Sequence, residues 1–125
     1  SPRLAERVKI GVQIAKDYAD DEDAFSKKIY DVIGAGVGII ESVPAAVSIA
    51  YYTRDPNKCC LMCANLGGDT DTIGAMATAI CGAFVGYSKI NPEYTELLRV
   101  QNPKTDFEEY INILEKGREL LGCGR

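Results

Sequence analysis

The sequence predicts an all-α protein, an orthogonal multi-helix bundle around one buried helix made of small residues. Apolar residues recur at helical spacing along most of the 125 residues. Residues that start and end helices, such as Asp, Pro and Gly, separate these segments. No segment alternates apolar and polar residues over the length of a β-strand. A chain of this size holds enough apolar residues for a core, and residues 1–125 are taken as one domain region.

The first two predicted helices flank an acidic run. Residues 2–18 carry apolar side chains at helical spacing, and Ser1 is a suitable N-cap. A second helix is predicted over residues 22–33, with Gly34 as its C-cap. We interpret Asp20–Asp23 as a solvent-exposed loop that also feeds the positive end of the second helix. Metal binding by this run is the less favoured alternative, because runs of like charge are usually solvated.

Three glycines alternate in Gly34-Ala35-Gly36-Val37-Gly38, which allows a close approach of the backbone to another group or a simple turn. This is not a dinucleotide-binding fingerprint, because a helix and not a strand precedes it. A third helix is predicted from Glu41 to about Tyr52, since Pro44 is tolerated only in a first turn. Ser42 is interpreted as a cap and not as a nucleophile, because the chain has no His to act as its base.

The fourth and fifth helices are joined by two glycines. Asp55 is expected to cap a helix over residues 56–66, and Gly67-Gly68 ends it. Residues 73–87 carry no charge and are rich in Gly, Ala, Thr and Cys. Because a helical Gly costs about 1 kcal/mol relative to Ala, this composition indicates a central helix packed closely on most sides. Its fifteen residues rise only about 22 Å, which is too short for a membrane span.

Two further helices are predicted, over residues 93–99 and 105–121. The side chains of the last helix expected to face inward are Phe107, Ile111, Leu114 and Leu121. Tyr51 and Tyr52, at the end of the third helix, are interpreted as packing residues, with stacking on an adenine as the alternative.

The composition excludes several functions. The chain has no His, which removes Ser-His-Asp and Cys-His catalysis and zinc sites that need imidazole. With 14 Lys+Arg against 18 Asp+Glu, the net charge of −4 argues against a nucleic-acid surface. No nucleic-acid partner and no membrane partner is therefore expected.

Cysteine usage bears on the compartment. The chain has five cysteines, an odd number, and no leader is visible before the first helix. A reducing, cytoplasmic location is therefore expected. Four of the cysteines are interpreted as small apolar residues in helix cores: Cys59, Cys60, Cys63 and Cys81. The fifth is Cys123. Metal or redox use of Cys60 and Cys63 is less favoured, because no second C-x-x-C pair follows.

One segment carries chemistry. Asp69-Thr70-Asp71-Thr72 places two carboxylates and two hydroxyls at the positive end of the apolar helix. Capping by Asp71 or Thr70 is one interpretation. Four consecutive oxygen side chains after two glycines also suit Mg²⁺, Mn²⁺ or Ca²⁺. An EF-hand loop does not fit, because with Asp69 as position one, position five is Ile73 and position twelve is Ile80 instead of Glu.

The segment Leu66-Gly67-Gly68-Asp69-Thr70-Asp71-Thr72-Ile73 resembles the C-terminal signature of the ADP-ribosylglycohydrolase family. Gly34–Gly38 with Glu41-Ser42-Val43-Pro44-Ala45-Ala46 resembles that family's second C-terminal block, and the likeness is greatest to its poly(ADP-ribose)- and serine-ADP-ribose-hydrolysing branch. The resemblance implies an all-α, Mg²⁺-dependent hydrolase that cleaves the glycosidic bond between ADP-ribose and its acceptor, with two Mg²⁺ ions in the complete site and Mn²⁺ as the alternative ion.

By the same resemblance, Asp69, Asp71 and Thr72 correspond to metal ligands, and Gly36 and Val37 to the loop beside bound adenosine. The family's Thr-Asp-Asp ligands and its catalytic glutamate lie near its N-terminus, and no counterpart is visible here, so no catalytic residue is assigned. The chain is therefore expected to be the C-terminal part of such an enzyme, with the missing N-terminal portion as a partner. Its substrate would be an ADP-ribosylated protein or a small molecule containing ADP-ribose. A binding or structural module that kept the fold, and a plain helical scaffold with capped helices, remain the alternatives.

Overall fold

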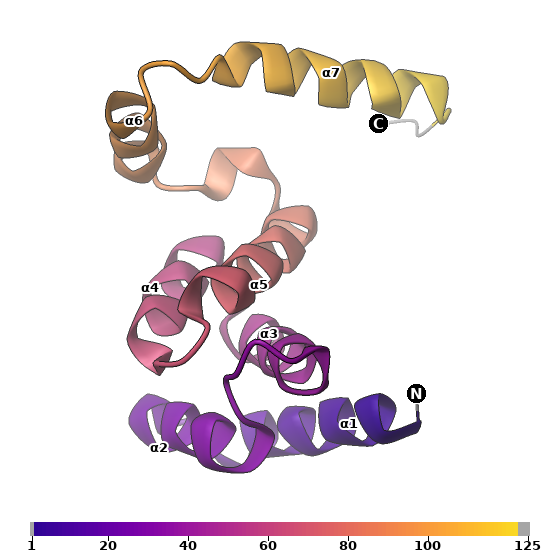
Figure 1. Cartoon of the computed structure of the whole chain (residues 1–125), viewed down its shortest axis with the longest axis vertical. Helices are drawn as coiled ribbons and strands as arrows, with labels where there is room; N and C mark the ends of the chain where they lie inside the picture. Colours follow the sequence, from indigo (N-terminus) through magenta and orange to yellow (C-terminus); the bar gives the residue numbers. More distant parts are fainter. Residues whose placement is uncertain (1, 123–125) are drawn as a thin grey trace. The chain divides into compact units, whose positions relative to one another are not determined.

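The computed structural model describes residues 2–122, and it is all-α as predicted: within these residues there are helices and turns but no strand (Figure 1). The predictions for Ser1 and Cys123 lie outside the described residues. The chain forms two compact units, residues 1–90 and 91–125. None of the described helices is long and apolar enough to cross a membrane.

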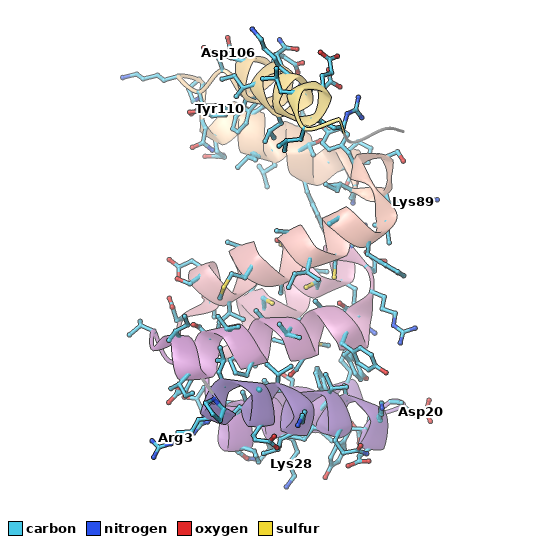
Figure 2. The ribbon with its side chains drawn as sticks, turned by 90° about the vertical axis from the view of Figure 1, so that its right-hand side faces the viewer. Arg3, Asp20, Lys28, Lys89, Asp106 and Tyr110 are labelled. Carbon is cyan, nitrogen blue, oxygen red and sulfur yellow. The ribbon has the colours of Figure 1, made fainter. Side chains whose placement is uncertain are left out.

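Helices α1 (Pro2–Asp17) and α2 (Glu22–Lys28) begin the first unit, and the acidic run joins them. The run is exposed and lies at the start of α2, as predicted. The structure adds that the Asp21 carboxylate accepts the N–H of Ala24 at 3.0 Å and so caps α2. Figure 2 shows Asp20 projecting from the turn after α1. The predicted helix continues to residue 33, but its last turn is the π-helical segment η1 (Ile29–Ile33). Gly34 ends it with φ of 89°, and its N–H bonds to the carbonyl of Ile29.

Helix α3 (Ile39–Thr53) is the most enclosed helix of the first unit, and Figure 1 shows it between α1 and α5. The prediction that it starts at residue 41 was wrong, because Gly38, in an extended conformation, is the N-cap. Pro44 is therefore an interior residue of the helix, and its ring is fully buried. Burial of the ring offsets the backbone hydrogen bond that Pro cannot donate. Ser42 lies in the first turn and donates to the Gly38 carbonyl at 3.3 Å, so it is not the cap.

Helix α4 (Pro56–Leu66) has the predicted bounds, and Asp55 accepts the N–H of Asn57 at 2.8 Å as its cap. Helix α5 (Thr70–Val85) starts three residues before the predicted start at residue 73 and ends two residues before the predicted end at residue 87. The prediction that it is buried on most sides was wrong within the described part of the chain. One row of α5 is buried against α3 and α4, whereas Phe84 on another face is 72% exposed. The buried row consists of Ile73, Ala77 and Cys81.

The second unit contains α6 (Pro92–Gln101) and α7 (Phe107–Leu120), after the 3₁₀ turn η2 (Tyr87–Lys89) that closes the first unit. Asn91 and Asp106 cap the two helices, and Arg99 pairs with Glu108 at 2.6 Å. The inward orientation predicted for α7 holds only in part. Phe107 and Ile111 are half-buried, and Leu114 and Leu121 are exposed. Two helices alone enclose too little volume to bury an apolar face.

Candidate functional site

The break between α4 and α5 places the predicted metal ligands on one short segment. Gly67 and Gly68 both have positive φ, at 86° and 72°, which turns the chain so that Asp69 becomes the N-cap of α5. Asp69 is half-buried, whereas Asp71 and Thr72 are exposed in the first turn. The Thr72 hydroxyl donates to Asp69 Oδ1 at 3.1 Å, so two of the three predicted ligands are in direct contact.

The two carboxylates of this segment also interact. A side-chain hydrogen bond with Asp69 is the main cause that lowers the pKa of Asp71, and the N–H groups of Thr72 and Asp71 lower it further. Asp69 itself makes no side-chain capping bond to the helix. Capping of α5 by Asp71 therefore accounts for the bonds that its carboxylate accepts from main-chain N–H groups. It does not account for the contact of the Asp69 carboxylate with the Thr72 hydroxyl. Two oxygen-rich side chains and a hydroxyl remain grouped at the positive end of α5.

This donor set fits a hard divalent cation in type. Carboxylate and hydroxyl oxygens are the ligands that Mg²⁺ and Mn²⁺ prefer. Within residues 2–122 there is no group of three or more His, Cys, Asp or Glu side chains that could hold a metal. With Thr72, the segment offers three ligand side chains, which fill about half of an octahedral shell if each supplies one oxygen. A metal held here needs further oxygen ligands.

The glycine loop, residues 34–38, contacts the same end of α5. The carbonyl of Ala35 accepts the N–H of Asp69 at 2.7 Å. The α-carbon of Gly68 packs against this carbonyl so closely that a Cβ there would stand 2.2 Å from the oxygen. The structure thus brings the two predicted regions, one with Gly36 and Val37 and one with Asp69–Thr72, into main-chain contact.

The loop presents an apolar side chain at its tip. Val37 is 84% exposed, the following Gly38 is exposed, and Gly36 is half-buried. Ile39, the first residue of α3, is also exposed, at 68%. The exposed side chain of Val37 offers an apolar surface on which a ring could pack. The oxygen side chains at the start of α5, which the loop contacts, offer a polar surface.

Sequence reasoning missed two residues of this arrangement, Ala35 and Glu41. Glu41 was placed in the second sequence block but was assigned no role. In the structure Glu41 Oε2 accepts the N–H of Gly36 at 2.8 Å, so its carboxylate turns back into the loop. Its position, third in a helix after an N-cap, is a known signal for an acidic side chain that reaches back to the preceding backbone.

The remaining candidates are structural. Tyr52 stacks on Phe25 with ring centroids 4.0 Å apart, so its ring packs as predicted, and Tyr51 lies under the Arg54 guanidinium at 5.0 Å. The acidic run contributes an ion pair between Glu22 and Lys58 at 2.7 Å.

The cysteines follow the prediction with one correction. Cys59, Cys63 and Cys81 are buried and free, as expected for small apolar residues of a core. A hydrogen bond with Cys63, together with burial, raises the pKa of the Cys59 thiol. Cys60 is exposed, against the prediction, because it follows Cys59 directly and therefore points to another side of α4.

The fold and this site define a helical protein with a candidate divalent-cation site at the start of an apolar helix. Residues 2–121 match the ADP-ribosylglycohydrolase family, described by that name, and the chain belongs to this family. The resemblance read from the two sequence blocks is thereby confirmed.

Several curated relatives resemble the chain. It is 47% identical over 120 residues to uncharacterized protein YegU of Escherichia coli (strain K12), which covers 95% of this chain and 35% of that protein. It is 35% identical over 86 residues to ADP-ribosylhydrolase ARH3 of Xenopus tropicalis, covering 60% of this chain and 25% of that protein. It is 29% identical over 87 residues to ADP-ribosylarginine hydrolase Tri1 of Serratia proteamaculans (strain 568), covering 70% of this chain and 24% of that protein. The chain thus spans about a third or less of the length of these relatives. No solved structure matches it.

Proposed function

We propose that this chain supplies the metal-binding and ADP-ribose-contacting part of a Mg²⁺-dependent ADP-ribosylhydrolase. The observation that carries the proposal is the 2.7 Å hydrogen bond from Asp69 N–H to the Ala35 carbonyl, which joins the glycine loop to the acidic end of α5. Membership of the ADP-ribosylglycohydrolase family supports it. So do the names of two relatives, ADP-ribosylhydrolase ARH3 and ADP-ribosylarginine hydrolase Tri1.

In this proposal Asp69, Asp71 and Thr72 bind Mg²⁺, with Mn²⁺ as the alternative ion and two ions in the complete site. A metal held by these residues would supply Lewis-acid stabilisation of charge at the glycosidic bond. The positive end of α5 is a favourable place for negatively charged side chains. The hydroxyl of Thr72 holds Asp69 Oδ1 at 3.1 Å and so restricts the orientation of that carboxylate. The other metal ligands and the catalytic acid–base group belong to the expected N-terminal portion of the enzyme.

The glycine loop contacts the adenosine part of ADP-ribose in this proposal. The exposed side chain of Val37 offers an apolar surface to the adenine ring. The N–H of Gly36 is already bonded to Glu41, so Gly36 serves through close backbone approach and not as a hydrogen-bond donor to the ligand. The substrate is an ADP-ribosylated protein or a small molecule containing ADP-ribose. We propose a cytoplasmic location, in keeping with the four free thiols of the described residues.

The test replaces the carboxylates with isosteric amides. Titration of the chain with Mn²⁺ should broaden the amide NMR signals of residues 68–73 in the unaltered protein and leave them sharp in an Asp69→Asn/Asp71→Asn variant. The matched control is Asp31→Asn, which removes an exposed carboxylate that pairs with Lys27. In a polypeptide that also contains the N-terminal portion, the double variant should abolish Mg²⁺-dependent release of ADP-ribose from an ADP-ribosylated protein. Full activity of the double variant would refute the proposal.

A second candidate is a module that binds ADP-ribose or a metal without turnover. The observation that favours it is the engagement of Glu41 with Gly36 N–H, which leaves the loop without a free carboxylate to act as a base. Calorimetric titration with Mg²⁺ and ADP-ribose, with and without the N-terminal portion of a relative, separates the two candidates. Turnover on mixing supports the hydrolase, and binding without turnover in both cases supports the module.

A further inference from the structure

Glu41 is the acidic side chain around which the glycine loop folds. It is half-buried in the first turn of α3, and its Oε2 accepts the N–H of Gly36 at 2.8 Å. A Cβ on Gly34 would stand 2.5 Å from Oε2, and a Cβ on Gly36 would stand 2.8 Å from it. A side chain at either glycine would therefore displace this carboxylate from its present position against the loop.

The loop transmits this contact to the start of α5. Ala35 lies between the two glycines, and its carbonyl accepts the N–H of Asp69 at 2.7 Å. Gly68 packs on the same carbonyl, where a Cβ would meet the oxygen at 2.2 Å. Residues 34–36 thus contact Glu41 through the N–H of Gly36 and contact Asp69 through the carbonyl of Ala35.

The other uses of a carboxylate are not found at Glu41. The salt bridges of the described residues join Lys9 to Glu6, Lys27 to Asp31, Lys58 to Glu22 and Arg99 to Glu108. Glu41 is in none of them. Among the described residues, the side chain of Glu41 instead accepts a hydrogen bond from the loop backbone, which is the contact expected of a side chain that shapes the main chain.

We propose that Glu41 is a positioning residue, which fixes the glycine loop and, through Ala35, the orientation of Asp69 at the start of α5. This proposal deepens the proposed function, on which its consequence for metal binding rests. Glu41 acts here through its reach and its acceptor oxygen and not through its charge. Glu41→Gln keeps both properties, and Glu41→Asp keeps the charge but shortens the side chain by one methylene.

The first experiment measures amide hydrogen exchange of the full chain by NMR without metal or ligand. Glu41→Asp should speed exchange of the Gly36 and Asp69 amides about tenfold or more, because the hydrogen bond to the loop is lost. Glu41→Gln should keep both rates within about threefold of the unaltered chain, since the amide oxygen still accepts. Asp31→Asn is the control and should leave both rates unchanged. Equal rates in the Asp and Gln variants, or an Asp69 rate that does not follow Gly36, would overturn the proposal.

The second experiment tests the consequence at the candidate metal site. The Mn²⁺ concentration that half-broadens the signals of residues 68–73 should rise about tenfold in Glu41→Asp and stay unchanged in Glu41→Gln, as for residues that orient metal ligands. The same concentration for both variants would overturn the link from the loop to the metal. If Asp69→Asn/Asp71→Asn leaves the broadening intact, the proposed function fails, whereas the exchange result still decides the role of Glu41.

Discussion

Replacement of Gly68 by Ala tests the contact that unites the two parts of the candidate site. A Cβ at Gly68 would stand 2.2 Å from the Ala35 carbonyl oxygen, whereas real Cβ contacts essentially never fall below 3.0 Å. The oxygen and the Cβ must therefore separate by at least about 0.8 Å (3.0 − 2.2). The oxygen belongs to the backbone and cannot rotate away as a side chain does. Its 2.7 Å hydrogen bond to Asp69 N–H lengthens or breaks as a result.

The cost has three parts. Positive φ at a residue with a Cβ costs about 1–3 kcal/mol, relief of the clash about 1–3 kcal/mol, and loss of the hydrogen bond about 1 kcal/mol. Gly86→Ala is the matched control, because Gly86 also has positive φ, at 88°, but a Cβ there meets nothing within 4 Å. The difference between the two variants isolates the clash and the hydrogen bond, and we expect Gly68→Ala to be the less stable by about 2–4 kcal/mol.

Urea unfolding followed by the amide NMR signals of residues 2–90 measures this difference within the first unit, with the free energy extrapolated to water. A difference below about 0.5 kcal/mol would mean that the Ala35 carbonyl yields freely. The reasoning that the loop and the start of α5 form one rigid site would then be wrong.

Two further predictions concern packing and thiol access. Gly11→Ala places a Cβ 1.9 Å from Ser48 Oγ, between α1 and α3, and should destabilise the chain by about 1–3 kcal/mol in urea unfolding, with part of the loss recovered in a Ser48→Ala background. Gly82→Ala, where a Cβ meets nothing within 4 Å, should instead stabilise α5 by about 1 kcal/mol; equal effects at Gly11 and Gly82 would contradict the packing. In the native chain iodoacetamide should label exposed Cys60 well before buried Cys59, as measured by peptide mass spectrometry, and equal labelling would show that α4 is not packed as described.

The sequence predicted those features that local chemistry determines. Asp55 caps α4 and Gly67 ends it, so the bounds of that helix agree with the prediction. Asp21 caps α2 for the same reason. Hydrogen bonds of this kind join residues two or three positions apart, and their donors and acceptors are visible in the sequence.

Features that depend on distant contacts were not predicted. The start of α3 was misplaced because a general rule about Pro44 took no account of the core that buries its ring. The burial of α5 was overestimated because its composition says how closely a helix can pack and not which faces have a partner. Metal binding by Asp69, Asp71 and Thr72 and ligand contact by Gly36 and Val37 stay predictions.

The contact between the two sequence blocks gives a structural reason for the glycines beside the candidate residues in both. Three atoms set the geometry of the candidate site: the Glu41 carboxylate oxygen, the Ala35 carbonyl oxygen and the Asp69 amide nitrogen. A Cβ at Gly68 would meet the Ala35 carbonyl of the main chain, and a Cβ at Gly34 or Gly36 would meet the Glu41 side chain. The side chains of Val37 and Asp71 are thereby left exposed and free of this internal network. If the predicted residues bind a ligand, this arrangement would hold the backbone in place while the predicted ligand-binding groups face outward, which is what binding with little loss of entropy requires.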